Sequence, residues 1–220
     1  GAKSNEPGSQ ERMNSHFTNA DRAEVLTQAL PYIKKFNGKT IVIKYGGNAM
    51  LSEELQHQVM QDIVLLHLVG VKVVLVHGGG PEITGMLKRL GKETQFVNGL
   101  RVTDKETVEI AQMVLAGKIN KSLVSFLEAM GGSAIGISGD GRLIMAKMKD
   151  PSLGYVGEVT KVNPGPIMDL MQKGYIPVVS SLGCDKDGNV YNINADTAAS
   201  KIAQALHAQR LILMTNIQGL

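Results

Sequence analysis

The chain of 220 residues is poor in aromatic side chains, which make up 4% of it, and it contains no tryptophan. Proteins that bind single-stranded nucleic acids need exposed aromatic rings on which the bases stack. The formal net charge is only +3, and no run of basic residues forms a nucleic-acid-binding motif. We therefore expect no nucleic-acid partner and a core built from aliphatic side chains.

Cysteine and long apolar runs are also scarce. Cys184 is the single cysteine, which excludes an internal disulfide and a cysteine-based zinc cluster and fits a reducing compartment. The five histidines do not have the spacing of metal ligands, so we expect no metal held by protein side chains. No stretch approaches eighteen consecutive apolar residues, so we expect no membrane span and a cytoplasmic protein.

Two common phosphate-binding signatures are missing as well. No G-x-x-x-x-G-K-[ST] segment occurs, so a P-loop is not supported, and no G-x-G-x-x-G follows a strand, which argues against a dinucleotide-binding unit. If the chain binds phosphate groups, it must bind them in another kind of glycine-rich turn.

Two stretches have the form of such a turn, TIVIKYGG at Thr40–Gly47 and VVLVHGGG at Val73–Gly80. Each is a run of β-branched and aliphatic residues that ends in glycines before a helical pattern, which is typical of a parallel strand and its crossover helix. Glycine lets backbone N–H groups approach a ligand closely, and a helix N-terminus favours negative charge. With Lys44 at the rim, the two turns predict a cradle for anionic groups, although a strand ending in Gly-Gly is also a common plain turn.

Strands and helices alternate along the rest of the chain. This α/β pattern predicts a three-layer αβα sandwich with a mainly parallel central sheet. The strand at 134–137 is expected to enter a β-hairpin insertion near 138–162, and Thr103 and Glu106 have the spacing of a capping box at the start of a long helical tract. Residues 1–12 are typical of a disordered leader, and 13–38 of a separate N-terminal helix.

Six segments together resemble one known family: KYGGNAM (44–50), HGGGPEI (77–83), NGLRVTD (98–104), LAGKINK (115–121), GYIPVVSS (174–181) and YNINADTAA (191–199). From about residue 19 to 220 the chain closely resembles the acetylglutamate kinases, of the amino acid kinase family. The resemblance implies the amino acid kinase fold, with an acetylglutamate-binding part at 39–194 and the start of a nucleotide-binding part at 195–220. It also implies phosphorylation of the side-chain carboxylate of N-acetyl-L-glutamate in arginine biosynthesis, with MgATP as co-substrate and Mg²⁺ carried by the nucleotide.

On the nucleotide side, the resemblance implies that Lys44 stabilises the transferring phosphoryl group and that Gly46 and Gly47 offer backbone amides to the ATP phosphates. Asp196 matches the aspartate that orients the catalytic lysines. It is not expected to act as a base, because a carboxylate acceptor has no proton to remove. Catalysis of this kind consists mostly of positioning and charge stabilisation.

On the acceptor side, the resemblance implies that Gly79 and Gly80 hold the substrate's side-chain carboxylate through backbone N–H groups. Arg101 matches the arginine that pairs with the α-carboxylate, where a planar guanidinium suits two-point binding. Asn192 matches the asparagine that fixes the other substituents of the α-carbon.

The sequence departs from the family pattern in two places. Chains of the family continue well past the position of Leu220, with a second glycine-rich segment and a second catalytic lysine, so we expect little turnover from these 220 residues alone. Asn216 stands where the family usually has aspartate in a turn that contacts the nucleotide, which predicts weaker ATP binding.

The helix at Asn19–Phe36 resembles the N-terminal extension of arginine-inhibited members of the family. This resemblance implies a homo-oligomer, either a dimer or a hexamer, with L-arginine as a feedback inhibitor. Two alternatives remain open at this point: another amino acid kinase acting on aspartate, glutamate, carbamate or a nucleotide, and a substrate-binding module without catalytic activity.

Overall fold

The computed structural model describes residues 18–214 and separates the chain into two units, with the boundary between Asn37 and Gly38. Helix α1 (Asn19–Phe36) belongs to the first unit and covers the residues of the helix predicted from the sequence. The expected leader at 1–12 and the departure at Asn216 lie outside the described residues.

The second unit is organised around a five-stranded sheet, in which all strands are parallel and follow the order β11-β1-β2-β8-β5. The strands are β1 (Thr40–Tyr45), β2 (Lys72–His77), β5 (Ala134–Ser138), β8 (Ile176–Ser180) and β11 (Arg210–Leu213). Val42, Val74 and Val178 are completely buried in three of them. Their burial is typical of a parallel sheet whose two faces are both covered.

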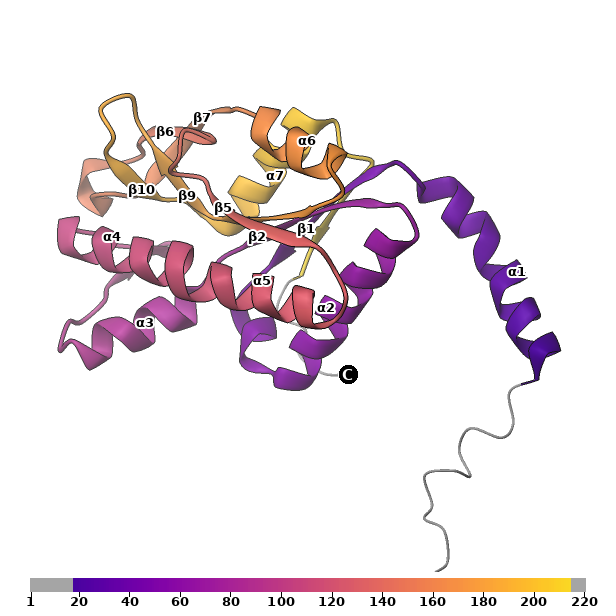
Figure 1. Cartoon of the computed structure of the whole chain (residues 1–220). Coiled ribbons are helices and arrows are strands. Elements are labelled where there is room, and N and C mark those ends of the chain that lie inside the picture. The colour runs from indigo at the N-terminus through magenta and orange to yellow at the C-terminus, as the bar shows by residue number, and fades with distance from the viewer. Residues whose placement is uncertain (1–17, 215–220) are drawn as a thin grey trace, which may run out of the picture. The chain divides into compact units, whose positions relative to one another are not determined.

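Helices cover both faces of this sheet (Figure 1). On one face lie α2 (Glu53–Leu68) and α5 (Asn120–Ala129), and on the other lie α6 (Gly165–Gln172) and α7 (Ala195–Leu206). Apolar side chains of α6, α7 and three of the strands form one continuous buried cluster on the second face. The predicted three-layer αβα arrangement with a mainly parallel sheet is therefore confirmed.

The hairpin insertion differs from the prediction in how it begins. Strand β5 pairs in parallel with β8, so it does not enter a hairpin, and the antiparallel pair is formed by β6 (Ile144–Met148) and β7 (Gly157–Val162). A Cβ atom on Gly139 would overlap the carbonyl oxygen of Leu182, because the turn after β5 packs directly against the first residue of β9 (Leu182–Cys184). This close packing ends the central strand and directs the chain into a second sheet.

The second sheet has four strands in the order β10-β9-β6-β7, where β9 is Leu182–Cys184 and β10 is Val190–Asn192. A short 3-10 turn, η3 (Pro151–Leu153), connects β6 to β7. The inserted hairpin is thus half of a larger mixed sheet, which places Asn192 and the start of α7 beside the central sheet.

The segment between β2 and β5 carries the helices near the glycine turns. It contains α3 (Gly80–Arg89), the two-stranded hairpin β3 (Phe96–Val97) and β4 (Leu100–Arg101), α4 (Lys105–Gln112) and the π-helical segment η2 (Met113–Ile119), which leads directly into α5. Another 3-10 turn, η1 (Gly47–Leu51), follows β1. Among residues 18–214, no helix combines the length and apolar character that crossing a membrane requires.

The capping box predicted at Thr103 is wrong by one residue. Asp104 is the N-cap of α4, and its carboxylate accepts the backbone N–H of Thr107 at 2.8 Å. Thr103 is instead buried, and its hydroxyl donates to the carbonyl oxygen of Arg101 at 2.7 Å. Asp104 also pairs with Lys92 at 2.8 Å, so this carboxylate stabilises both the helix start and the preceding loop.

Candidate active site

The two glycine turns lie side by side at the carboxyl edge of the central sheet. Tyr45 and His77 are register partners at the ends of β1 and β2, and the Gly78 N–H donates to the Tyr45 carbonyl oxygen at 3.1 Å. The Tyr45 hydroxyl donates to the Ala49 carbonyl oxygen at 3.0 Å and thereby fixes the turn that follows β1. Gly47 has a φ of 62°, which favours glycine at this position.

Lys44 brings a positive charge to both turns. A Cβ atom on Gly46 would lie 3.5 Å from the Lys44 Nζ and 3.5 Å from the Gly78 nitrogen, so the ammonium group lies next to both turns. The Lys44 Nζ is also 3.0 Å from Oδ1 of Asp196, in the first turn of α7. This carboxylate oxygen is buried, and within the described residues it has no partner in hydrogen-bonding geometry. Charge rather than a directed hydrogen bond therefore holds the pair together.

Arg101 is the second cation of the site, and it is buried with no acidic partner among the described residues. The residue is only 5% exposed. Its guanidinium donates to the hydroxyl groups of Thr94 and Thr84 and to the Gly80 carbonyl oxygen, at 3.0 to 3.1 Å, and it lies 4.7 Å from the centre of the Phe96 ring. Within residues 18–214 no carboxylate forms an ion pair with it. Burial lowers the pKa of Arg101, and an arginine nevertheless stays charged, so this position favours an anionic ligand.

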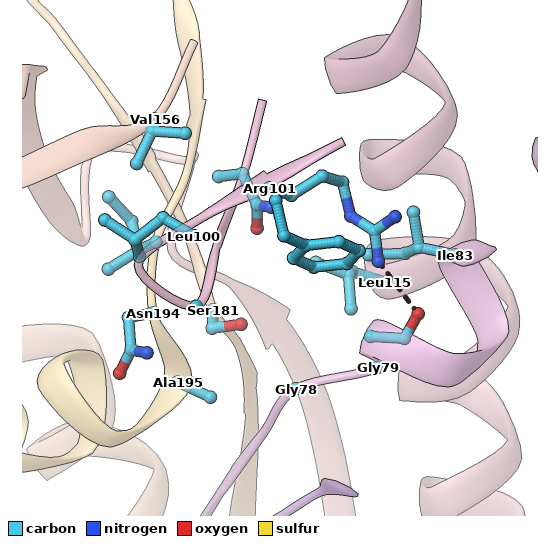
Figure 2. A pocket seen from close by; sticks show the side chains of 15 residues that line it. Gly78, Gly79, Ile83, Leu100, Arg101, Leu115, Val156, Ser181, Asn194 and Ala195 are labelled. Carbon is cyan, nitrogen blue, oxygen red and sulfur yellow. Dashed lines mark hydrogen bonds between the residues drawn. The ribbon is translucent and has the colours of Figure 1, made fainter. Parts of the chain in front are cut away.

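A cavity of about 590 Å³, part of it open to solvent, lies between Arg101 and the starts of two helices. Helix α3 begins at Gly80 and α7 at Ala195, and both of these residues line the cavity. In Figure 2, Asn194 and Ala195 lie on the side of the cavity opposite the Arg101 guanidinium. Two helix N-termini and one buried guanidinium thus give this space a positive electrostatic character, which suits a small molecule with negative charges.

Gly79 has no room for a side chain. A Cβ atom there would overlap Cδ1 of Ile119 and would lie 2.8 Å from Cδ2 of Leu115. Both of these side chains come from the π-helical segment η2. Since the φ of Gly79 is 172°, which any residue can adopt, the requirement for glycine here is one of space and not of backbone conformation.

The structure groups the residues that the sequence predicted for the site. Gly79, Gly80, Arg101 and Asn192 line the one cavity. Lys44 and Asp196 form a pair beside Gly46, at the neighbouring turn. This proximity agrees with the prediction, and the role of each residue stays a prediction.

Sequence reasoning missed four residues that support the site. Thr84 and Thr94 hold the Arg101 guanidinium, and nothing in the sequence pattern marks them. His77 and Asn120 form a buried hydrogen-bonded pair below the second glycine turn. The position of His77, a polar residue at the end of an apolar strand and directly before three glycines, is a signal that could have identified it.

Comparison with known proteins agrees with this arrangement. The model of the amino acid kinase family matches residues 39–220. The acetylglutamate kinase of Thermoanaerobacter pseudethanolicus is 58% identical over 203 residues, which are 90% of this chain and 68% of that protein. The acetylglutamate kinase of Caldanaerobacter subterraneus subsp. tengcongensis is 56% identical over 201 residues, or 90% of this chain and 67% of that protein. The chain therefore spans about two thirds of the length of these relatives.

A solved structure supports the fold assignment. The crystal structure of smu.665 from Streptococcus mutans UA159 superposes with a TM-score of 0.74 at 35% sequence identity, and the match covers 82% of this chain and 74% of that one. Sequence, family model and structure all agree, and the chain belongs to the amino acid kinase family.

Proposed function

We propose that this protein transfers the γ-phosphoryl group of ATP to the side-chain carboxylate of N-acetyl-L-glutamate, which yields N-acetyl-L-glutamyl 5-phosphate and ADP in arginine biosynthesis. Curated relatives that are 56 to 58% identical over 90% of this chain carry the name acetylglutamate kinase, which supports this substrate. In the reaction, a carboxylate oxygen forms a bond to the γ-phosphorus while the bond from that phosphorus to the ADP oxygen breaks. The acceptor carries no proton, so no base is needed.

The buried guanidinium of Arg101 is the observation that carries the proposal. It lines the cavity, is 5% exposed and has only neutral acceptors among the described residues. A ligand carboxylate would supply the missing negative charge. Two parallel hydrogen bonds to the planar guanidinium require the carboxylate to replace Thr84 or the Gly80 carbonyl at Nη2, because both hydrogens of that nitrogen are already donated. We assign the α-carboxylate of N-acetyl-L-glutamate to Arg101 and the remaining α-substituents to Asn192.

The side-chain carboxylate is assigned to the backbone N–H groups of Gly79 and Gly80. Both residues line the cavity next to the start of α3, where the helix dipole favours an anion. The adjacent turn at Gly46 and Gly47 is assigned to the ATP phosphates. Because the two turns follow neighbouring strands, a carboxylate on one turn would lie beside a phosphate on the other, as transfer requires.

Lys44 is assigned to the transferring phosphoryl group, and Asp196 to the orientation of the Lys44 ammonium. The 3.0 Å separation of the two side chains and the burial of the Asp196 Oδ1 support these roles. A fixed ammonium beside the phosphoryl group would stabilise the charge that develops on its oxygens during transfer. MgATP fits this donor set as a co-substrate, since backbone amides and an ammonium bind phosphate oxygens while Mg²⁺ is held by the nucleotide.

Isothermal titration calorimetry on the 220-residue chain tests the proposal, with N-acetyl-L-glutamate and MgATP titrated separately. Binding of both ligands supports a kinase. Binding of N-acetyl-L-glutamate alone supports a non-catalytic substrate-binding module, and preference for free glutamate, aspartate or carbamate identifies another member of the family. Absence of N-acetyl-L-glutamate binding contradicts the proposal.

We also infer a homo-oligomer in which α1 contacts another subunit. Leu26 and Leu30 are four residues apart on this helix, and both are largely exposed, so they form an apolar face that a partner could cover. Analytical ultracentrifugation of the chain with and without residues 13–36 tests this inference, and an unchanged oligomer would contradict it. Cytoplasmic location and feedback inhibition by L-arginine stay predictions.

A further inference from the structure

A buried polar network lies directly below the second glycine turn. His77 has no exposed surface and Asn120 is 1% exposed. The Nδ1 of His77 is 3.0 Å from the Gly78 carbonyl oxygen, and its Nε2 is 3.1 Å from the amide nitrogen of Asn120. None of the roles assigned above uses this pair.

The network determines which nitrogen of His77 carries the proton. The Asn120 amide nitrogen is also 3.0 Å from the carbonyl oxygen of Val178 and 3.3 Å from that of Ile137, so its two hydrogens are shared among three acceptors. Its oxygen accepts from the Lys121 ammonium at 3.1 Å. A flipped amide would bring its oxygen against two carbonyl oxygens, so this orientation is fixed. Because Nε2 of His77 faces this donor nitrogen, it carries no proton, and the proton on Nδ1 is donated to the Gly78 carbonyl oxygen.

The bond from His77 fixes the direction of one peptide group. In a trans peptide the carbonyl oxygen and the following N–H point in opposite directions, and no peptide bond of the described chain is cis. Holding the Gly78 carbonyl on the imidazole therefore turns the Gly79 N–H to the side away from it. Gly78, Gly79 and Gly80 line the cavity and His77 does not, so that side is the ligand side. Within the described residues the Gly79 N–H has no acceptor of its own.

We propose that His77, held in one tautomer by Asn120, is a positioning residue that aims the Gly79 N–H at the substrate's side-chain carboxylate. The inference rests on the proposed function for the identity of the ligand only. The π-helical segment η2 supports this arrangement in two ways. Asn120 follows the segment immediately, and the Leu115 and Ile119 side chains of the segment pack against Gly79. π-Helical turns of this kind are frequent at functional sites.

Two amide variants separate the two nitrogens of His77. In His77→Asn the side-chain nitrogen lies where Nδ1 lies and can still donate to the Gly78 carbonyl, whereas His77→Gln places its amide at the position of Nε2 and loses that bond. Both variants keep a polar side chain of similar volume. Leu127→Ala, a completely buried position in α5 outside the cavity, is the control for loss of stability alone.

The first measurement needs no ligand. Residual dipolar couplings of ¹⁵N-labelled protein report the direction of the Gly79 N–H relative to the amides of β2. We expect the unmodified direction in His77→Asn and in Leu127→Ala, and a changed or averaged coupling in His77→Gln. An unchanged Gly79 coupling in His77→Gln would overturn the proposal whatever the ligand is.

The second measurement compares N-acetyl-L-glutamate with N-acetyl-L-norvaline, which has a methyl group in place of the side-chain carboxylate. We expect His77→Gln to raise the Kd for N-acetyl-L-glutamate about tenfold to a hundredfold, which is the usual effect of losing one hydrogen bond to a charged group. The Kd of His77→Gln for N-acetyl-L-norvaline should change less than about threefold. His77→Asn should retain most of the affinity for both ligands. Equal weakening of both ligands would overturn the proposal. If the unmodified chain binds no N-acetyl-L-glutamate, the proposed function fails, and the dipolar couplings still decide the role of His77.

Discussion

Replacing Arg101 by methionine tests the acceptor half of the site directly. The methionine side chain keeps an apolar stem at this buried position and removes the guanidinium, which lies against the Phe96 ring and donates to two hydroxyl groups and one carbonyl oxygen. Loss of these hydrogen bonds destabilises the unliganded protein, while removal of a buried charge that has no acidic partner within residues 18–214 stabilises it by a similar amount. We expect the free energy of unfolding to change by less than about 2 kcal/mol.

The effect on ligand binding is expected to be much larger. Removing one partner of a buried, hydrogen-bonded charge pair costs about 2 to 5 kcal/mol, which corresponds to a rise in Kd for N-acetyl-L-glutamate of about thirtyfold to several thousandfold. Arg101→Lys keeps the charge and loses the second arm of the pair, so its affinity should lie between those of the unmodified protein and Arg101→Met.

A ligand without the α-carboxylate provides the control. 4-Acetamidobutyrate differs from N-acetyl-L-glutamate only in lacking that group, so it should bind the unmodified protein weakly and bind Arg101→Met equally weakly. Calorimetry gives the Kd of each variant for each ligand, and these values form a cycle in which the guanidinium and the α-carboxylate are removed separately and together. Urea denaturation of each variant gives the change in the free energy of unfolding. The reasoning is refuted if Arg101→Met weakens both ligands by the same factor, or if it leaves N-acetyl-L-glutamate binding unchanged.

Three further predictions concern the two glycine turns. Gly79→Ala should lower the free energy of unfolding in urea by about 1 to 3 kcal/mol because of the overlap with the π-helical segment, whereas Gly80→Ala, whose Cβ meets nothing within 4 Å, should change it by less than about 0.5 kcal/mol. Burial lowers the pKa of His77 from 6.5 to about 4, so between these two pH values the unfolded chain binds more protons than the folded one. The neutral His77 should therefore contribute up to about 3 kcal/mol to the free energy of unfolding above pH 6.5, and this contribution should be lost as the pH falls to 4. In His77→Asn the urea midpoint should not show this dependence on pH. In calorimetry, Lys44→Met should raise the Kd for MgATP at least about tenfold and the Kd for N-acetyl-L-glutamate less than about threefold. An unchanged Kd for MgATP would contradict the assignment of Lys44 to the phosphate groups.

The local parts of the site could be predicted because their signals are local. A run of β-branched residues that stops in glycines indicates a strand and a tight turn, and the ends of β1 and β2 match this prediction. The positions of Lys44, Gly79 and Gly80 follow from the strand ends alone. Adjacency of the two turns follows as well, since carboxyl ends of neighbouring parallel strands lie on the same edge of the sheet.

Other features depend on contacts between distant segments, which no local pattern records. The hairpin was expected at the end of β5 because Ser138–Gly141 has the composition of a turn, but pairing of β5 with β8 and the packing of Gly139 against Leu182 decide the path of the chain. Likewise, no pattern in the helical tract marks the π-helical segment, whose Leu115 and Ile119 fill the space beside Gly79. The burial of Arg101 depends on Thr84 in a neighbouring helix, so only family resemblance could predict its role.

The two cations of the site differ in how their charges are balanced, and this difference fits the two anions of the proposed reaction. In the described part of the chain Arg101 has neutral partners only, so the cavity has a net positive charge that a permanent carboxylate can neutralise. Lys44 already lies 3.0 Å from Asp196, so its charge is partly balanced before a nucleotide arrives. A balanced ammonium binds a ground-state phosphate less strongly and still stabilises the additional charge that forms on the oxygens during transfer. For the proposed reaction, this difference predicts tight binding in the acceptor half and selective stabilisation of the transition state in the phosphoryl half.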